Sequence, residues 1–323
     1  MYNVYKKKGR RKRYMEQLKI NAYAKINLSL DVVRRRPDGY HDVKMIMQTV
    51  DLYDVITMEK AESGIHTTVE MGKSFTAGGM DAQADKVTEE LPADESNLIY
   101  KAAKLIMDSK NMTDGVKIHL QKNIPIAAGM AGGSTDAAAV FRGMNQLFSL
   151  GMSTEEMKEM AVKIGADVPY CIEGGTQLSE GIGEILTPIK GIPDFYLLIA
   201  KPEISVSTKY VYENLHLEEL SKHPDVDGMT EAIQNGELDG IVCRMENVLE
   251  SVTVKQYPVI GEIREFMKEH GAENALMSGS GPTVFGIYKE KEKAEKAAEL
   301  LEKEKLARQI FVTTIKKNAK EAD

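Results

Sequence analysis

A glycine-rich stretch in the first half of the chain, residues 125–137 (PIAAGMAGGSTDA), constrains the fold more than any other part of the sequence. The residues before it, 116–120 (VKIHL), alternate apolar and polar side chains, which is typical of a strand. After it, apolar residues recur at helical spacing from 137 to 150, with Ser134 or Thr135 as a candidate N-cap. The glycines are therefore predicted to lie between a strand and the start of a helix.

Glycines at such a place suit a bound anion. Glycine adopts positive φ and lets a ligand approach the backbone, while the free N–H groups and positive dipole end of a helix favour a phosphate. A plain glycine turn is the simpler alternative, but three glycines within five residues, followed by Ser-Thr, argue against it. The stretch is neither a Walker loop nor a Gly-x-Gly-x-x-Gly motif, so we predict a phosphate-binding loop of another kind.

The charge along the chain is uneven. The 323 residues carry a formal net charge of −7, yet residues 1–19 have a net charge of +7, which leaves −14 for the rest. An acidic body argues against a nucleic-acid partner. The basic run at 6–13 could be an arm for nucleic acid or a membrane surface, but we favour a disordered extension or a true start at Met15.

Several classes of protein are excluded by what the sequence lacks. No apolar run approaches the ~18 residues of a membrane span, and no secretory signal is present, so we expect no membrane partner. Two cysteines, Cys171 and Cys243, do not suggest a disulfide framework, which favours a reducing cytoplasm. The six histidines have no zinc-ligand spacing, and no Gly-x-Ser-x-Gly elbow occurs.

The clearest strand is 20–32, where apolar residues at even positions are predicted to share one face. Lys25 and Asn27 would project side by side from the other face, although a lone strand lysine is commonly just a solvated edge. A turn at 34–41 follows, and 45–58 is predicted to be two strands broken near Asp51. Residues 72–96 are predicted to be a surface loop, and 98–107 an amphipathic helix.

A helix is predicted at 154–164, closed by Gly165. Pro169 then prevents the helix from continuing and biases Val168 toward extended geometry. Asp167 is therefore expected in a turn at an element boundary, where an aspartate commonly serves only as a cap or turn residue.

A second unit is predicted after a boundary between about 172 and 193. A strand at 195–200 precedes helices near 207–216, 228–248 and 257–269. Strands at 275–277 and 283–288 flank the loop 278–282, and a helix at 289–305 and a strand at 309–315 complete the unit. This order is typical of a split β-α-β sandwich.

The loop PxxxGMAGGST at 125–135 resembles the phosphate loop of the galactokinase, homoserine kinase, mevalonate kinase and phosphomevalonate kinase (GHMP) superfamily. Three further motifs are similar to those of its branch that acts on 4-diphosphocytidyl-2-C-methyl-D-erythritol: 24–28 (AKINL) with 36–41 (RPDGYH), 165–169 (GADVP), and 277–283 (MSGSGPT). The resemblance covers about residues 20–315, with its four motifs in the family's order.

The resemblance implies a two-domain α/β (α+β) fold. After a basic extension at 1–19, an N-terminal ATP-binding catalytic domain like ribosomal protein S5 would span 20–180. A C-terminal ferredoxin-like sandwich would span 181–323, with ATP and substrate in the cleft between the domains. The implied reaction is transfer of the γ-phosphoryl group of ATP, with Mg²⁺, to a tertiary hydroxyl of the methylerythritol unit in the non-mevalonate isoprenoid pathway.

The motifs also imply the site residues. Asp167 would be the catalytic base and Lys25 its charged partner. Asn27, Tyr40, His41, Lys122, Thr208 and Tyr212 would line the diphosphocytidyl substrate, Tyr40 by stacking and His41 by reading the cytosine. ATP would contact Pro125, Ile126, Ala127, Ala128, Gly129, Met130, Ala131, Gly132, Gly133, Ser134 and Thr135, with Asn97 near adenine. Ligands for the metal are not indicated.

The departures from the family pattern are small. Met130-Ala131 stands where Leu-Gly is common, so one glycine is lost, and Tyr170-Cys171 replaces an aromatic pair. Two alternatives stay open: another small-molecule kinase of the superfamily, or a nucleotide-binding regulator without catalysis. The turn at 37–41 argues against the first, and retention of Lys25 and Asp167 against the second.

Overall fold

The structure, a computed structural model, describes residues 17–72, 91–220 and 222–317. The basic run at 6–13 and most of the predicted surface loop, 73–90, lie outside the described residues. The first part of the chain forms six strands and four helices within the described ranges. These are β1 (Gln17–Arg35), β2 (His41–Ala61), β3 (Ile65–Met71), α1 (Leu98–Ser109), β4 (Gly115–Lys122), α2 (Gly132–Leu147), α3 (Thr154–Ala161), α4 (Val168–Glu173), β5 (Thr176–Gly181) and β6 (Ile185–Pro188).

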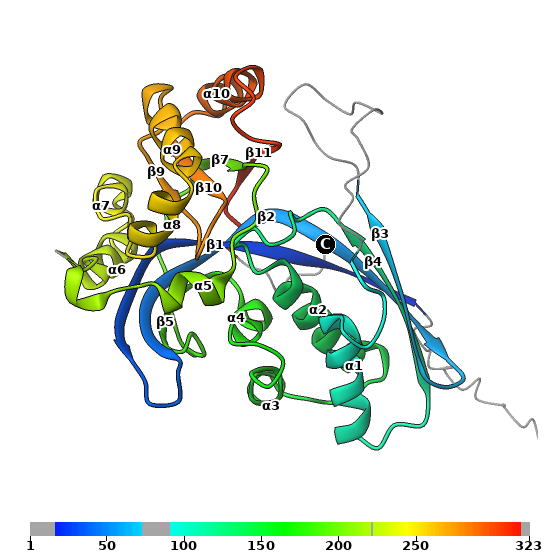
Figure 1. The fold of residues 1–323 in the computed structure, drawn as a ribbon. Coiled ribbons are helices and arrows are strands. Elements are labelled where there is room, and N and C mark those ends of the chain that lie inside the picture. Colours follow the sequence, from blue (N-terminus) through cyan, green and yellow to red (C-terminus); the bar gives the residue numbers. More distant parts are fainter. Residues whose placement is uncertain (1–16, 73–90, 221, 318–323) are drawn as a thin grey trace, which may run out of the picture.

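The first sheet is built around β2, which crosses it without a break (Figure 1). The strand order is β3-β4-β2-β1-β8, where β8 (Glu246–Asn247) comes from the second half of the chain. β5 pairs with β2 and with β6. On the side away from β1, β2 pairs with β5 over 43–48 and with β4 over 55–61. The predicted break near Asp51 is therefore wrong. Asp51 lies where β2 changes partners, and a bridge from Val50 to Ile315 fills that gap.

The alternation predicted for β1 fails at two bulges. The pairing with β2 shifts register between Tyr23 and Lys25 and again between Asn27 and Ser29. At the first shift β2 has two more residues than β1, and at the second β1 has one extra residue. Such irregular pairing changes the face that the following side chains occupy. Ala24, Ile26 and Leu28 consequently pack in one hydrophobic cluster, whereas Ala22, Leu30 and Val32 pack in the other. The short segment between the bulges is the one that carries Lys25 and Asn27.

Helices α1 to α4 cover one face of this sheet (Figure 1). The helix after the glycine loop begins at Gly132, five residues before the predicted start, and Ala131 is its N-cap in the left-handed region with φ 57°. Neither Ser134 nor Thr135 is the N-cap, because both lie inside the first turns of α2. The helix can start this early because two glycines and a left-handed alanine turn the chain directly out of the loop.

A short helix that the sequence did not predict follows α3. Val168 is the first residue of α4, so the extended geometry predicted for it is wrong. Pro169 is compatible with this helix because proline fits the first turn, where its missing N–H has no intrahelical partner. Asp167 occupies the N-cap position.

The second sheet has the order β11-β7-β10-β9, with each neighbouring pair antiparallel. Its strands are β7 (Tyr196–Lys201), β9 (Asn274–Met277), β10 (Val284–Tyr288) and β11 (Gln309–Thr314). This is the order of a split β-α-β sandwich, as predicted. Its helices are α5 (Thr208–Glu213), a 3-10 turn at Leu217–Glu219, α6 (Val226–Gln234), α7 (Leu238–Val242), α8 (Glu250–Gln256), α9 (Val259–Glu269) and α10 (Lys291–Lys303).

The long helix predicted at 228–248 is wrong. Gly236, with φ 71°, separates α6 from α7, and the chain then enters β8 (Glu246–Asn247), which joins the first sheet parallel to β1. Within the described residues no helix is long and apolar enough to span a membrane. Cys171 is buried and Cys243 exposed, and both are free thiols.

Candidate active site

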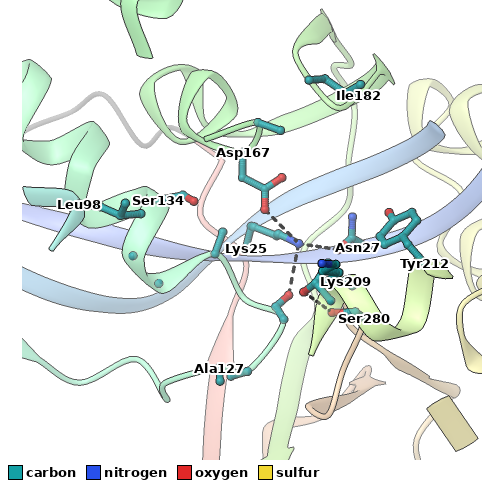
Figure 2. Close-up of a pocket in the computed structure, with 18 of the residues that line it drawn as sticks. Lys25, Asn27, Leu98, Ala127, Ser134, Asp167, Ile182, Lys209, Tyr212 and Ser280 are labelled. Atoms are coloured by element: carbon teal, nitrogen blue, oxygen red, sulfur yellow. Dashed lines mark hydrogen bonds and ion pairs between the residues drawn. The ribbon is translucent and has the colours of Figure 1, made fainter. Parts of the chain in front are cut away.

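A cavity of about 1130 Å³ lies where the two halves of the chain meet, and Figure 2 shows its central residues. Its wall contains residues from β1, the 34–41 turn, the glycine loop, α5 and the loop 278–281. Nearly all of the residues predicted to form the site contribute to this wall. They are Lys25, Asn27, Tyr40, His41, Asn97, Lys122, Pro125, Ile126, Ala127, Ala128, Gly129, Ala131, Gly132, Gly133, Ser134, Asp167, Thr208 and Tyr212.

Two of the predicted residues are turned away from the cavity. Met130 is buried in the hydrophobic cluster that also contains Ile26 and Phe285. Thr135 is buried, and its hydroxyl donates a hydrogen bond of 2.7 Å to the carbonyl of Tyr23. Both residues therefore support the loop from behind.

The glycine loop exposes backbone to the cavity. Ala127, Gly129 and Ala131 all have positive φ (49°, 69° and 57°), so the chain winds tightly before α2. Gly132, Gly133 and Ser134 then line the cavity at the first turn of a 16-residue helix, where backbone N–H groups have no intrahelical acceptor. These N–H groups and the helix dipole make this end of the cavity suitable for phosphate.

A second glycine loop, Ser278 to Gly281, packs directly on the first. A Cβ at Gly129 would lie 2.2 Å from the carbonyl oxygen of Ser278, so only glycine fits there. The Ser278 hydroxyl also donates to the Gly129 carbonyl at 3.0 Å. This loop is held in turn by the buried Asn247, whose amide donates to the carbonyls of Met277 and Gly279 at 2.8 Å each.

The sequence reasoning assigned no role to Asn247 or to the second loop. The signal for the loop was available, because 278–281 places two glycines between two predicted strands. Asn247 carried no such signal, since its partners lie 30 and 32 residues away in the chain.

The Lys25 ammonium connects three parts of the site (Figure 2). It donates to Asn27 Oδ1 at 2.7 Å and to the Gly129 carbonyl at 3.2 Å, and it lies 4.0 Å from Asp167 Oδ2. Lys25 is buried, with 4% of its surface exposed, so the solvated-edge alternative is wrong for this lysine. A buried ammonium is strongly desolvated, and the oxygens of its three partners compensate for that.

Asp167 presents its carboxylate to the cavity, with about a third of the side chain exposed. It makes no side-chain hydrogen bond to cap α4. A carboxylate that is beside an ammonium, open to the cavity and free of a capping bond could accept a proton from a bound hydroxyl.

Lys122 lies beneath the first turn of α2. Its ammonium is paired with Asp54 and, at 2.8 Å, with Asp136, and all three groups are buried. A Cβ at Gly132 would approach Lys122 Nζ to 2.9 Å, so the ammonium lies directly behind the phosphate loop. Burial raises the pKa of Asp136 well above its usual range; the Lys122 charge opposes this and the Asp54 carboxylate adds to it.

Aromatic rings gather at the opposite end of the cavity. The His41 and Tyr212 rings have centroids 5.2 Å apart, and Tyr40 is 59% exposed beside them. Burial, and then the charge of Arg35, lower the pKa of His41, which keeps its imidazole neutral near pH 7. The Thr208 hydroxyl shares a 2.8 Å hydrogen bond with that of Ser280, which joins α5 to the second glycine loop.

Asn97 lines the cavity but also has a structural role. Its Oδ1 caps α1 by accepting from the N–H of Ile99 at 3.0 Å, and its Nδ2 donates to the Pro92 carbonyl at 2.7 Å. These two bonds account for its position without a ligand, so its proximity to adenine stays a prediction.

Two family models match the chain. The model described as the GHMP kinases N terminal domain matches residues 97–175, and the model described as GHMP kinases C terminal matches residues 219–307.

Curated relatives match over nearly the whole chain. A 4-diphosphocytidyl-2-C-methyl-D-erythritol kinase of Lachnoclostridium phytofermentans is 50% identical over 283 residues, 88% of this chain and 92% of the relative. Its namesake in Clostridium perfringens is 47% identical over 302 residues, 93% of this chain and 99% of the relative.

Solved structures agree with these matches. A crystal structure of 4-(cytidine 5'-diphospho)-2C-methyl-D-erythritol kinase superposes with a TM-score of 0.75 at 30% identity and covers 92% of this chain and 99% of its own. A homoserine kinase from Cytophaga hutchinsonii superposes with a TM-score of 0.73 at 18% identity, over 98% of this chain and 99% of its own. The second similarity shows the shared fold alone.

Proposed function

The chain belongs to the GHMP kinase family, and from this premise we propose that it transfers the γ-phosphoryl group of ATP to the 2-hydroxyl of 4-diphosphocytidyl-2-C-methyl-D-erythritol. Relatives named for this kinase of the non-mevalonate isoprenoid pathway are 47–50% identical and cover most of the chain. This similarity supports the acceptor substrate as well as the reaction class.

One observation carries the assignment of roles: the Lys25 ammonium contacts the phosphate loop at the Gly129 carbonyl and lies 4.0 Å from Asp167. Phosphoryl transfer depends mainly on positioning and charge stabilisation. A cation between the loop, where the ATP phosphates would bind, and the carboxylate, which would face the acceptor hydroxyl, lies beside the path of the phosphoryl group from ATP to that hydroxyl. We therefore assign Lys25 to the transferring group and Asp167 to the acceptor hydroxyl.

In the proposed reaction, the ATP phosphates lie against the N–H groups of 132–134 at the start of α2. The Asp167 carboxylate accepts the proton of the acceptor hydroxyl. The hydroxyl oxygen forms a bond to the γ-phosphorus while the bond between that phosphorus and the bridging oxygen of ADP breaks. Lys25 stabilises the negative charge on the equatorial oxygens, and Asn27 fixes the ammonium through its 2.7 Å hydrogen bond.

The aromatic end of the cavity would hold the cytidine. Tyr40 and Tyr212 are suited to stack on the base, and a neutral His41 can both donate and accept hydrogen bonds at its polar edge. Thr208 lies between this end and the second glycine loop. Each of these substrate contacts is part of the proposal.

Magnesium is expected because it neutralises phosphate charge in such reactions. Within the described residues, no group of three or more His, Cys, Asp or Glu side chains is placed to hold a metal. A site with few protein ligands still fits Mg²⁺, because this ion is commonly bound by one or two protein oxygens together with substrate phosphates and waters. The Ser134 hydroxyl, in the cavity wall at the first turn of α2, is the protein oxygen that would hold it beside the ATP phosphates.

A substrate panel tests the proposal. Release of ADP is measured with 4-diphosphocytidyl-2-C-methyl-D-erythritol, homoserine and mevalonate as acceptors at equal concentrations. We expect turnover with the first and a kcat/KM at least a hundredfold lower with the other two. Preference for homoserine or mevalonate would assign the chain to another branch of the family, and ATP binding without turnover of any acceptor would indicate a non-catalytic relative.

A further inference from the structure

Arg142, on the face of α2 away from the phosphate loop, ties together the two elements that carry Lys25 and Asp167. Its Nη1 donates to the carbonyl of Cys171 in α4 at 3.0 Å, and its Nη2 donates to the carbonyl of Asn21 in β1 at 3.3 Å. Asn21 precedes Lys25 by four residues on β1, and Cys171 follows Asp167 by four residues on α4. One guanidinium thus holds both elements at the same distance along the chain from the site.

The connection continues through the backbone to Asp167. The N–H of Cys171 donates to the Asp167 carbonyl at 3.1 Å, so Cys171 is hydrogen-bonded to Asp167 through its N–H and to Arg142 through its carbonyl. On β1, the Thr135 hydroxyl of α2 holds the carbonyl of Tyr23, midway between Asn21 and Lys25. Both β1 and α4 pack against α2, which makes α2 their common support.

Packing of the hydrophobic core alone does not explain why position 142 is an arginine. Arg142 is only partly exposed, and none of the ion pairs in the described part of the chain includes it. Burial lowers the pKa of its guanidinium, which reflects the free-energy cost of desolvating the charge. The advantage of a guanidinium here is its planar fork of donors, which can bond two carbonyls on separate elements at once.

We propose that Arg142 is a positioning residue that sets the separation between the Lys25 ammonium and the Asp167 carboxylate. The inference rests on the proposed function, because it concerns the pair to which that function assigns the chemistry. The pair is separated by 4.0 Å, the outer limit of an ion pair, with no direct hydrogen bond between the two groups. Its geometry must therefore be fixed by the elements that carry it.

The test compares Arg142→Met with Asn145→Ala. Asn145 lies one turn further along α2, is also partly exposed, and bonds only the backbone of Met152, at 2.9 Å in both directions. Arg142→Met should lower kcat at least tenfold while the KM values for ATP and the cytidine substrate change less than threefold. Asn145→Ala should lower the melting temperature without changing kcat.

A double variant separates positioning from general stability. In an Asp167→Asn background, Arg142→Met should have almost no further effect on kcat, because it acts through the carboxylate that is already lost. Independent effects that multiply would overturn the inference, as would an Arg142→Met enzyme with unchanged kcat. If Arg142→Met does not fold, Arg142→Lys, which keeps the charge but cannot bond two carbonyls in the same way, takes its place in both measurements.

The wild-type enzyme distinguishes the two proposals. Absence of ADP release from wild type with the cytidine substrate would refute the proposed function. If the wild type is active but the effects of Arg142→Met and Asp167→Asn on kcat multiply, only the role of Arg142 is refuted.

Discussion

Asp167 occupies the N-cap position of α4 without using its side chain as a cap. An aspartate at such a place ordinarily accepts from the backbone N–H groups of the first turn. Here its carboxylate lies 4.0 Å from Lys25 and opens to the cavity instead. The residue was identifiable from its sequence motif, whereas its freedom from capping required the structure.

Asp167→Asn should lower kcat by ~10²–10⁴-fold, because the amide keeps the shape of the carboxylate but cannot accept the proton. That range corresponds to ~3–5 kcal/mol in the barrier, since each tenfold in rate is ~1.36 kcal/mol. Steady-state kinetics measure kcat, and calorimetric titration with ATP measures the affinity for ATP separately. A folded variant within a few-fold of wild-type kcat would show that Asp167 is only a turn residue.

Asp136 and Asp54 should respond differently to loss of charge. Asp54 accepts from Lys122 and from the N–H groups of Asn123 and Ile124, so Asp54→Asn should lower the free energy of unfolding by about 3–5 kcal/mol. Asp136 Oδ1 is buried without a partner among the described residues, and burial raises the pKa of Asp136 well above its usual range, so the folded state disfavours the charged form of this carboxyl. Asp136→Asn should therefore leave stability at pH 7 unchanged or raise it.

The raised pKa of Asp136 also predicts that the free energy of unfolding depends on pH. Folded Asp136 keeps its proton to a higher pH than the unfolded chain does, so its contribution to stability declines as pH rises above about 4. Urea unfolding between pH 5 and 8 should show this decline in the wild type and its absence in Asp136→Asn. Equal losses in the Asp54 and Asp136 variants would contradict this division of roles.

Gly129 and Gly151 form a matched pair for testing contact between the loops, because their φ values are 69° and 68°. A Cβ at Gly151 meets nothing within 4 Å, so Gly151→Ala should cost about 1 kcal/mol from backbone strain alone. Gly129→Ala carries the same strain and also a 2.2 Å clash with Ser278. It should cost clearly more in denaturant unfolding and weaken ATP binding in calorimetry; equal costs would show that the loops separate freely.

At the scale of elements, the strands and helices with regular periodicity could be predicted from the sequence, and the irregular ones could not. The glycine loop, α1, α9, α10 and the second sheet follow local patterns of apolar and glycine residues. The register shifts between β1 and β2 leave no trace in the alternation of β1, since 20–32 is regular throughout. They matter most for the site, because they decide which face of the sheet receives Lys25.

Pairing between segments far apart in the sequence explains the other predictions that the structure corrects. β2 runs through Asp51 because β5, β4 and Ile315 supply partners along its length, and none of these is adjacent in sequence. The residues of the site were recognisable as motifs, but their partners were not. Asn247, Arg142 and Asp54 lack a local signal because each bonds groups brought together only by folding.

Helix α5 offers a test of the substrate end, because it carries two tyrosines with different surroundings. Tyr212 lines the cavity and lies beside His41, whereas Tyr210 is 41% exposed and does not line it. Tyr212→Ala should weaken binding of the cytidine substrate by ~1–3 kcal/mol, the usual range for a lost base stack, and leave ATP binding unchanged. Tyr210→Ala should alter neither; an effect of Tyr210→Ala alone would place the cytidine elsewhere.

At the scale of the whole molecule, the two sheets are joined through the middle of β2. Ile315 bridges to Val50, the Lys316 N–H donates to the Thr49 carbonyl at 2.8 Å, and the Thr313 hydroxyl donates to the Asp51 carbonyl at 2.8 Å. The C-terminal end of the second sheet thus contacts β2 of the first sheet directly. A division into folding units at about residue 180 stays a prediction.

Removal of residues 1–14 should leave kcat and the melting temperature nearly unchanged. Among the described residues, pairing of β1 with β2 begins at Gln17 with Glu59, so the truncation removes none of the described pairs of this ladder. Thermal unfolding and the ADP-release assay on both forms measure the effect. A large loss of soluble or active protein would assign the basic run a structural role.

Strand β8 sets an order in time for synthesis of this protein. Ser29 and Leu30 of β1 pair with Glu246 and Asn247, so the sheet that bears Lys25 gains its last strand from the final third of the chain. At the usual ~5–20 residues per second, a ribosome reaches Asn247 roughly 10–40 s after it has made Leu30. Throughout that interval the nascent chain has an open sheet edge, and the second glycine loop at 278–281 is made later still. The enzyme is thus assembled late in translation, although Lys25 and Asp167, the two residues proposed for the chemistry, are made before β8.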